Sequence, residues 1–322
     1  MSTSERTVGF TRTVPGNPEI TGACVRTLGS KKATKQELLA FVPGLDALVT
    51  MYTDPVDETL LKAAGDQLKI ICNFAVGFDN IDISACKNRG VTVCNTPDAV
   101  TEGTANIAWL LILSAARRLI EADRYARSPA YAEHGHLGMD EFLGMDLCAK
   151  NLLIVGAGRI GYATAQRAKA FGMNILYVAR SGHLDFEMAP LGATRVSLEE
   201  GLGLADVVSV HTPLTKQTRH LINAQNLKLL KDGSILVNTS RGPVVDESAL
   251  VESLKSGRLF GVGLDVFEQE PVVHPGLIAH ERAVLTPHIG SAEVSWREAM
   301  TQMVCTNIQA QFTGKTPPNQ IA

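Results

Sequence analysis

The sequence predicts an α/β protein with two domains, each built on a mostly parallel β-sheet. Short apolar runs typical of buried strands alternate with helical patterns along the whole chain, as in parallel sheets that are covered by helices. The chain has 322 residues, more than one hydrophobic core usually organises, so two domains are expected. A glycine-rich turn follows the most apolar run, in the middle of the chain.

Composition argues against several classes of function. Hydrophobic residues make up 45% of the chain and the formal net charge is −3, so no basic field for nucleic acid and no cationic face for a membrane is expected. Residues 1–10 lack the basic start and apolar run of a secretory signal, and the apolar stretch 107–113 is too short to span a bilayer. These features predict a cytoplasmic protein without a nucleic-acid or membrane partner.

The six cysteines indicate reduced, mostly buried thiols. They are scattered along the chain, and no C-x-x-C pair occurs among them. A zinc site would need clustered ligands, which the sequence does not contain. We therefore predict no bound metal.

In the first hundred residues, strand-like and helical stretches follow one another in order. Strands are expected at 7–10, 47–51, 70–74 and 91–94, with helices between them that include 34–41 and 59–64. From Thr101 one long helical pattern runs through Trp109 and Leu113 towards Tyr125. Its first part is apolar on nearly every face, which predicts burial against several elements or a second subunit.

The second series of elements begins after a polar loop at 128–146. The most apolar strand, 152–155, comes first, and further strands are expected at 174–178, 207–211, 235–238, 262–266 and 283–285. After Ser291 the chain places Trp296, Met300 and Val304 at helical spacing, which predicts a C-terminal helix.

The glycine motif belongs to the strand 152–155, which leads directly into Gly156-Ala157-Gly158-Arg159-Ile160-Gly161 and a helical pattern. Gly156 permits the tight turn, Gly158 lets the backbone approach a pyrophosphate, and Gly161 lets the helix lie close to the strand. The helix N-terminus offers free N–H groups and the positive end of its dipole to phosphates. Strand, turn, helix and second strand in one unit predict a Rossmann-like dinucleotide-binding domain.

The end of the second strand of this unit bears on the choice of cofactor. NAD-binding units usually place an acid there to hold the ribose 2′-hydroxyl. Here the strand ends with Ala179-Arg180-Ser181, and no acid stands at this point. Arg180 could pair with the 2′-phosphate of NADP and Ser181 could add a hydroxyl. We therefore predict that NADPH is preferred, with NADH as the alternative.

Three later strands end in polar loops with side chains suited to catalysis. Arg241 follows the strand 235–238, Glu270 follows 262–266, and His288 follows 283–285. Because the carboxyl ends of the strands surround the ligand crevice in an open α/β sheet, we expect these three residues to converge.

At these residues the chain resembles the D-isomer-specific 2-hydroxyacid dehydrogenase family, and within it the glyoxylate/hydroxypyruvate reductases. The resemblance covers nearly the whole chain, through NFAVGFDNID at 73–82, the glycine motif, HTPLT at 211–215 and the three loops. The reductase group is indicated by PHIGSA at 287–292 and by the Arg180-Ser181 pair. The resemblance implies reduction of a small 2-oxo acid, glyoxylate or hydroxypyruvate, to the 2-hydroxy acid with NAD(P)H.

The resemblance, together with the mid-chain glycine motif, also predicts the plan of the chain. Both domains are expected to be Rossmann-like, and the nucleotide domain, residues 101–286, is expected to be inserted in a discontinuous substrate domain, residues 1–100 and 287–322. Members of the family commonly form homodimers through the nucleotide domain and its long helix, so the resemblance implies a homodimer.

The resemblance implies roles that physical chemistry supports for the three loop residues. Arg241 presents a planar, two-pronged donor suited to the substrate carboxylate and the reacting carbonyl oxygen. His288 would be the general acid in reduction and the base in oxidation. Glu270 would hydrogen-bond the other ring nitrogen of His288.

Other site residues follow from the resemblance alone. The backbone N–H groups of Val76 and Gly77 resemble the loop that receives the substrate carboxylate, and Ser291 is expected beside the substrate. Asp265 resembles the acid that holds the nicotinamide carboxamide. The remaining cofactor contacts implied in this way are Thr104, Arg159, Ile160, Thr212, Thr239 and Gly290.

Two alternatives stay open. The same scaffold serves oxidation of phosphoglycerate, lactate or phosphite, and a phosphorylated substrate would require an additional Lys or Arg, of which none is obvious near Val76. Some relatives are nucleotide-sensing corepressors that bind peptides, but these carry disordered extensions, whereas this chain ends a few residues after its last helix. Fold alone does not decide between these functions.

Overall fold

The structure, a computed structural model, describes residues 5–322 and divides into two compact units. The first unit contains the described residues up to Gly103 together with Ser291–Ala322, and the second unit is Thr104–Gly290. The domain boundary predicted from the sequence, between residues 286 and 287, assigned His288 to the substrate domain. In the structure His288 belongs to the second unit.

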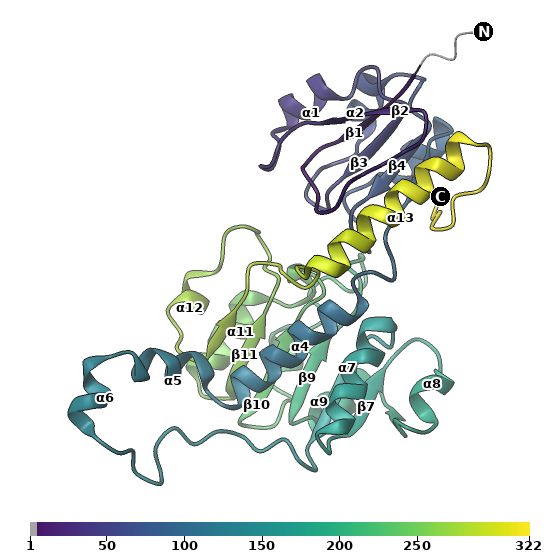
Figure 1. Cartoon of the computed structure of the whole chain (residues 1–322). Helices are drawn as coiled ribbons and strands as arrows, with labels where there is room; N and C mark the ends of the chain where they lie inside the picture. The colour runs from purple at the N-terminus through teal and green to yellow at the C-terminus, as the bar shows by residue number, and fades with distance from the viewer. Residues whose placement is uncertain (1–4) are drawn as a thin grey trace. The chain divides into compact units, whose positions relative to one another are not determined.

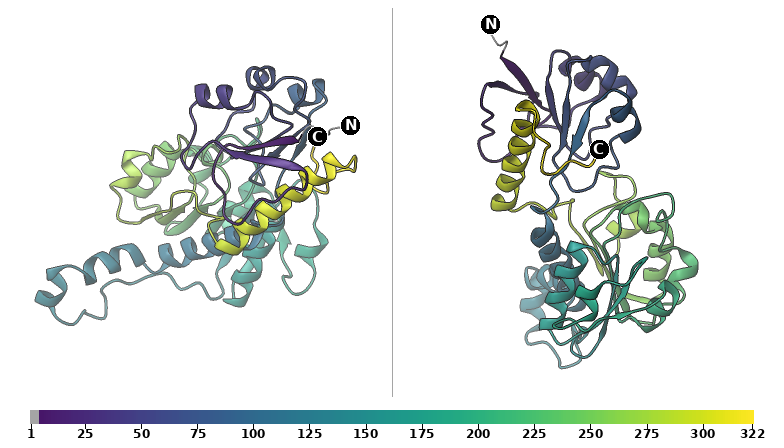
Figure 2. Two further views of the ribbon diagram at one scale, coloured as in Figure 1. Left: turned by 45° about the horizontal axis from the view of Figure 1, so that its top comes forward. Right: turned by 90° about the vertical axis from the view of Figure 1, so that its right-hand side faces the viewer.

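The first unit is built on a five-stranded sheet in the order β2-β1-β3-β4-β5, and all of its strands are parallel. Helix α13 lies along one face of this sheet, and α1, α2 and α3 lie on the other, as the right-hand view of Figure 2 shows. The strands are β1 Arg6–Phe10, β2 Ala23–Thr27, β3 Ala47–Thr50, β4 Ile70–Asn73 and β5 Thr92–Cys94, and the helices are α1 Lys35–Phe41, α2 Glu58–Ala64, α3 Ile83–Asn88 and α13 Val294–Phe312.

Local sequence explains where the helices of the first unit begin. Helix α1 starts at a capping box, in which the Thr34 hydroxyl accepts from the Glu37 N–H at 3.2 Å and the Glu37 carboxylate accepts from the Thr34 N–H at 2.8 Å. Asp57 and Asp82 cap α2 and α3 in the same way with their carboxylates. The buried faces of these helices pack on the sheet, and their core includes Leu38 of α1, Leu60 of α2 and Ile71 of β4.

The second unit is built on a seven-stranded parallel sheet in the order β12-β11-β10-β9-β6-β7-β8 (Figure 1). Its strands are β6 Asn151–Val155, β7 Asn174–Val178, β8 Thr194–Arg195, β9 Val207–Val210, β10 Ser234–Asn238, β11 Leu259–Leu264 and β12 Ala283–Leu285. Its helices are α4 Thr101–Ala116 (which begins in the last residues of the first unit), α5 Leu119–Ala126, α6 Pro129–His134, α7 Arg159–Ala170, α8 Leu184–Glu187, α9 Leu198–Leu204, α10 Ala224–Leu227, α11 Glu247–Lys255, α12 Pro275–Ile278 and the 3₁₀ turn η1 Gly242–Val244.

Helices cover both faces of the second sheet, which explains why β6 is apolar at successive positions. Leu153 and Val155 belong to the core under α9 and α11, whereas Leu152 and Ile154 belong to the core under α4 and α7. Alternate side chains of a strand point to opposite faces, so a strand buried on both sides needs apolar residues throughout. The predicted α/β fold with two parallel sheets is confirmed.

Two sequence predictions for the region before β6 are wrong. The long helix from Thr101 is two helices, because Arg118 takes a left-handed conformation at φ 52° and the Ala116 carbonyl accepts from the Met145 N–H at 2.8 Å. The polar segment 128–146 is not loop throughout, since Pro129 begins the short helix α6. Proline is favoured at this first helical position because it lacks the N–H that a helix start leaves unpaired.

Two strands were not predicted at all, and both lie at the edges of their sheets. Strand β2 is largely exposed and β8 has only two residues, both exposed, so neither carries an apolar run that could reveal it. No helix in residues 5–322 is long and apolar enough to cross a membrane.

Candidate active site

The candidate site of the second unit lies at the carboxyl edge of its sheet. Strand β6 has β7 on one side and β9 on the other, so successive connections leave it in opposite directions. Such a switch point is where open α/β sheets bind their ligands. The glycine turn follows β6, and the three predicted catalytic residues follow β10, β11 and β12, which lie in a row beyond β9.

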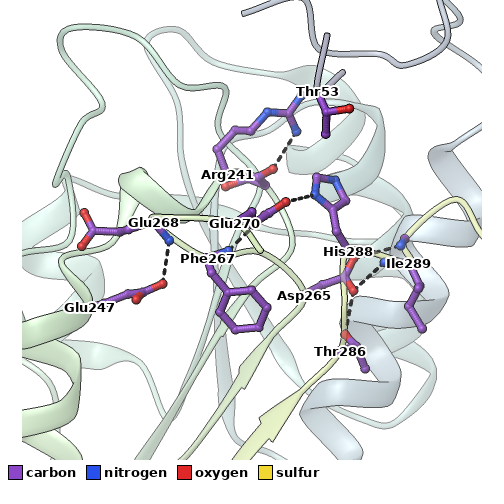
Figure 3. Close-up of polar contacts among 12 residues, drawn as sticks. Thr53, Arg241, Glu247, Asp265, Phe267, Glu268, Glu270, Thr286, His288 and Ile289 are labelled. Carbon is purple, nitrogen blue, oxygen red and sulfur yellow. Dashed lines mark hydrogen bonds and ion pairs between the residues drawn. The ribbon is translucent and has the colours of Figure 1, made fainter. Parts of the chain in front are cut away.

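His288 and Glu270 form a hydrogen-bonded pair. The Nδ1 atom of His288 lies 2.9 Å from Oε2 of Glu270, and both side chains are about one quarter exposed (22% and 26%). The other oxygen of Glu270 accepts from the Phe267 N–H at 3.1 Å, so the carboxylate is fixed from both sides (Figure 3). A carboxylate in this position fixes the orientation of the imidazole ring.

Asp265 holds the loop that carries His288. Its carboxylate accepts from the Thr286 hydroxyl at 2.6 Å and from the N–H groups of Ile289 at 2.8 Å and Gly290 at 2.9 Å. Asp265 is 1% exposed, and this burial raises the pKa of its carboxyl group. The sequence interpretation assigned Asp265 to the cofactor; in the structure its oxygens accept from the Thr286 hydroxyl before His288 and from two backbone N–H groups after His288 (Figure 3).

Arg241 begins the segment that packs against the Glu270 loop. Asn238 holds this segment: its amide group donates to the Arg241 carbonyl at 2.9 Å, and its oxygen accepts from the Ser240 N–H at 3.0 Å. A Cβ atom on Gly242 would lie 1.9 Å from the Phe267 carbonyl. The two backbones therefore touch at Gly242, and only glycine fits there. The structure thus brings together the segments that carry Arg241, Glu270 and His288.

Glu247 is a residue of this region that sequence analysis missed. It lies in the first turn of α11, is 6% exposed, and accepts from the Glu268 N–H at 2.7 Å. Burial raises the pKa of its carboxyl group, and the neighbouring carboxylates of Glu268 and Glu270 add to this effect. Glu247 therefore ties the segment that follows Arg241 to the loop that carries Glu270. In the sequence, a glutamate in the first turn of a helix cannot be distinguished from an ordinary surface residue.

The glycine turn has the geometry that a dinucleotide requires. Gly156 has φ 108°, and a Cβ atom there would lie within 2.9 Å of the backbone of His211. A Cβ atom on Gly161 would lie 2.4 Å from the Gly156 carbonyl, so α7 approaches β6 closely. At Gly158 a Cβ atom would meet nothing within 4 Å, and no side chain caps α7. This open helix N-terminus, with Arg159 and Ile160 in its first turn, suits a pyrophosphate.

The segment after β7 presents Arg180 and Ser181, which are exposed. Arg195 on β8 braces this segment: its guanidinium donates to the Ala179 carbonyl at 3.0 Å and to the Arg180 carbonyl at 2.9 Å. These hydrogen bonds from Arg195 were not expected from the sequence, because Arg195 lies on strand β8, which was not predicted. Two guanidinium groups thus belong to the part of the sheet edge where the ribose 2′ substituent is expected.

The other predicted cofactor residues also lie at this edge. Thr212 follows β9 and Thr239 follows β10, and the buried Thr239 hydroxyl has no partner within residues 5–322. A Cβ atom on Gly290 would lie 3.1 Å from the Thr104 hydroxyl and 3.3 Å from Asp265. Thr104, Asp265 and Gly290 are therefore neighbours. An unpaired buried hydroxyl fits a site that a polar ligand completes.

The predicted substrate loop lies in the first unit, at the carboxyl end of β4. The Gly77 carbonyl accepts from the Asn73 amide at 2.7 Å, and the Val76 carbonyl accepts from the Asn95 amide at 2.8 Å. Within the described residues the N–H groups of Val76 and Gly77 have no acceptor. Both carbonyls are thus held by asparagines while two adjacent N–H groups remain to bind an anion. Asn73 and Asn95 were not among the predicted site residues.

Ser291, the other predicted substrate residue, begins the second segment of the first unit. Its carbonyl accepts from the Arg297 guanidinium at 3.3 Å, and this contact belongs to the start of α13. No hydrogen bond joins Ser291 to the Val76–Gly77 loop within the described part of the first unit.

Comparison with known proteins decides the family. The sequence model of the D-isomer specific 2-hydroxyacid dehydrogenase NAD binding domain matches residues 109–290, more than half of the chain. The chain belongs to this family. The glyoxylate reductase of Thermococcus onnurineus is 47% identical over 291 residues, which are 89% of this chain and 86% of that protein. The glyoxylate reductase of Pyrococcus horikoshii is 44% identical, over 92% of this chain and 89% of that protein.

Solved structures agree with this assignment. An NADPH-dependent glyoxylate/hydroxypyruvate reductase from Sinorhizobium meliloti, in complex with NADP and malonate, has a TM-score of 0.85 at 31% identity, with 99% of this chain and 97% of that chain covered. As a member of the D-2-hydroxyacid dehydrogenase family, this protein is a nicotinamide-dependent oxidoreductase, as its sequence predicted.

Proposed function

We propose that the protein reduces a small 2-oxo acid, glyoxylate or hydroxypyruvate, to the corresponding 2-hydroxy acid with NAD(P)H. The observation that carries this proposal is the His288–Glu270 pair, anchored through Asp265 at the edge of the sheet that bears the glycine turn. A histidine that is held in place by a carboxylate can act as a proton donor. The resemblance to glyoxylate reductases supports the substrate class.

Each residue has a distinct part in the proposed reaction. When bound, the nicotinamide cofactor supplies a hydride to the carbonyl carbon. His288 delivers the proton to the carbonyl oxygen, and Glu270 balances the charge on its ring. Arg241 orients the carboxylate and carbonyl and stabilises negative charge that develops on oxygen. The free N–H groups of Val76 and Gly77 receive the carboxylate.

A substrate panel tests the reaction. NADPH and NADH oxidation would be followed at 340 nm with glyoxylate, hydroxypyruvate, pyruvate and phenylpyruvate. We expect turnover of the small acids and little of phenylpyruvate. Inertness towards every 2-oxo acid with either cofactor would reject the reaction and would favour the nucleotide-sensing alternative.

We propose further that NADPH is the preferred cofactor. Arg180 is exposed after β7, and its carbonyl accepts a hydrogen bond from the Arg195 guanidinium. No acidic residue stands at the end of β7, where it would bind a ribose 2′-hydroxyl. Arg180→Ala is expected to raise KM for NADPH by about 10- to 150-fold, the range of a hydrogen bond to a charged group, and to change KM for NADH little. Steady-state kinetics measures both values. Lys169→Ala, at the far end of α7, is the control. A native preference for NADH that Arg180→Ala leaves unaltered would contradict this assignment.

A homodimer is also proposed, formed through the second unit. Helices α5 and α6 and the segment after them extend away from the rest of that unit as an arm (Figures 1 and 2). Apolar side chains on the arm are exposed, among them Leu143 at 60% and Met139 at 95%. At its base a cavity of about 550 Å³ is lined by Leu113, Ala116, Leu147 and Phe171. A second copy of the chain would bury these surfaces.

The oligomeric state tests this surface. Sedimentation equilibrium is expected to give twice the mass of one chain, and Met139→Asp with Leu143→Asp is expected to shift the protein towards the monomer, because burying two carboxylates is costly. Glu252→Lys, an exposed change on α11 away from the arm, is the control for altered charge. A monomeric native chain would contradict the proposal.

A further inference from the structure

The carboxyl edge of the first sheet carries a cation to which the proposed reaction gives no role. Arg12 stands two residues beyond the end of β1. Strands β1, β3 and β4 are consecutive neighbours in this sheet, with Phe10 opposite Val49 and Val49 opposite Cys72. The segments that follow the three strands therefore lie side by side, and Arg12 shares this edge with the turn 51–54 and with the Val76–Gly77 loop.

The guanidinium of Arg12 is incompletely paired. It donates to the Thr53 hydroxyl at 3.2 Å, its Nε atom is buried without a partner, and it has no ion pair with a carboxylate among residues 5–322. A guanidinium has five N–H donors in a planar fork. A partly buried cation loses hydration free energy, and one hydrogen bond to a neutral hydroxyl compensates for little of that loss. A bound anion would compensate for more of it.

The acid nearest in sequence to Thr53 makes no direct ion pair with this cation within residues 5–322. Asp54 is 1% exposed, and one carboxylate oxygen accepts from the Thr11 hydroxyl at 2.5 Å and from the Met51 N–H at 2.9 Å. Asp54 therefore closes the turn 51–54 on β1. The other carboxylate oxygen of Asp54 lies 3.5 Å from the Thr53 hydroxyl. Asp54 therefore holds Thr53 beside Arg12, and within residues 5–322 no ion pair joins Asp54 to Arg12 directly.

Asparagines fix the distance between this cation and the substrate loop. The Asn80 amide donates to the carbonyls of Met51 at 3.1 Å and Asp54 at 2.9 Å, and the oxygen of Asn80 accepts from Asn73 at 3.0 Å. Asn73 in turn holds Gly77. Neighbouring strands lie about 4.8 Å apart, so the ends of β1 and β4 are separated by about 10 Å, and the Arg12 side chain spans part of this distance.

We infer that Arg12, with Thr53, determines substrate specificity by binding a second anionic group on C3 of the 2-oxo acid, either a carboxylate or a phosphate. The inference rests on the proposed function, because the first carboxylate is assigned to the N–H groups of Val76 and Gly77. No basic residue is obvious near Val76 in the sequence, because Arg12 lies far from Val76 along the chain. The order of the strands brings the two segments to the same edge of the sheet. A planar fork of donors suits either anion.

Kinetics with matched substrates tests this inference. We would measure kcat/KM for glyoxylate, pyruvate, oxaloacetate and 3-phosphohydroxypyruvate. The native enzyme is expected to use at least one of the two acids with a second anionic group, oxaloacetate or 3-phosphohydroxypyruvate, better than pyruvate. Arg12→Gln is expected to lower the ratio of kcat/KM for that acid to kcat/KM for glyoxylate by about 10- to 150-fold, the range of a hydrogen bond to a charged group. Arg12→Lys should restore part of the ratio. The better of the two acids identifies the anion as carboxylate or phosphate.

Controls separate a specificity role from a structural one. Lys62→Gln removes an exposed charge from α2 and should leave the ratio unchanged. Thr53→Val removes the hydroxyl that holds Arg12 and should lower the ratio by a smaller factor. Where Arg12→Gln fails to fold, Thr53→Val and Arg12→Lys still test the inference. An equal loss with glyoxylate, or a native preference for pyruvate over both acids with a second anionic group, would overturn it.

Binding of the products gives a readout that does not depend on turnover. Calorimetric titration should show D-malate or 3-phosphoglycerate binding more tightly than D-lactate, and Arg12→Gln should abolish the difference. Equal affinities of the native protein for all three would reject the second anion site. If no 2-oxo acid is reduced, the proposed function fails, whereas the titration still tests Arg12.

Discussion

Replacement of His288 by alanine is expected to lower kcat by about 10²–10⁴-fold, the range typical of general acid–base catalysis by a positioned side chain. The reason is that His288 is held by Glu270 at 2.9 Å and by a loop anchored on Asp265, so its ring is positioned to transfer a proton. Affinity for the cofactor should change little. Steady-state kinetics and fluorescence titration with NADPH would measure the two effects separately.

A matched histidine and a matched carboxylate sharpen this test. His136→Ala removes an exposed histidine from the arm and should leave kcat unchanged. Glu270→Gln keeps a hydrogen-bond acceptor but removes the charge, so kcat should fall by less than in His288→Ala. Full activity of His288→Ala would remove the proposed proton donor and, with it, the mechanism.

Replacement of Arg241 by alanine is expected to lower kcat/KM by at least about 10²–10³-fold, the loss seen when one donor to a developing oxyanion is removed. Both kcat and KM should suffer, because the same guanidinium orients the carboxylate and stabilises charge on the carbonyl oxygen. Arg241→Lys should restore little, since a point charge cannot replace the planar fork. Initial rates over a range of glyoxylate concentrations would provide both constants.

Arg219→Ala provides the control for Arg241, because Arg219 is an exposed arginine in the loop after β9. It should retain native kcat and KM. A change confined to KM in Arg241→Ala would show that Arg241 contributes to substrate binding alone. Unchanged kcat in both Arg241→Ala and His288→Ala would show that neither residue takes part in the chemical step.

Local patterns predicted most of the central strands, because these strands are buried on both faces. The interior strand β7, at 174–178, and the edge strand β12, at 283–285, were predicted with their observed bounds, and the other predicted strands lie within a few residues of theirs. A strand covered on both sides must be apolar throughout, so its signal survives in the sequence. The exposed edge strands β2 and β8 lack this constraint and were missed.

The break at Arg118 could not be predicted, because it depends on a distant partner. A Cβ atom on Gly144 would lie 2.4 Å from the Ala116 carbonyl, and the Met145 N–H donates to the same carbonyl. The helix therefore ends where a segment nearly thirty residues later occupies its last turn. Helical periodicity alone continues through this point and cannot register such a contact.

By itself the sequence determined the α/β class and the glycine turn, because strand burial and tight turns restrict residue type locally. It also predicted Arg241, Glu270 and His288 as catalytic residues, from their positions after strands and from the family resemblance. Tertiary structure alone decided that Asp265 anchors the His288 loop, that Glu247 and Gly242 join the Arg241 segment to the Glu270 loop, and that Arg12 shares an edge with the substrate loop. Parallel strands bring their carboxyl ends to one edge whatever their separation along the chain, so these contacts have no local signature.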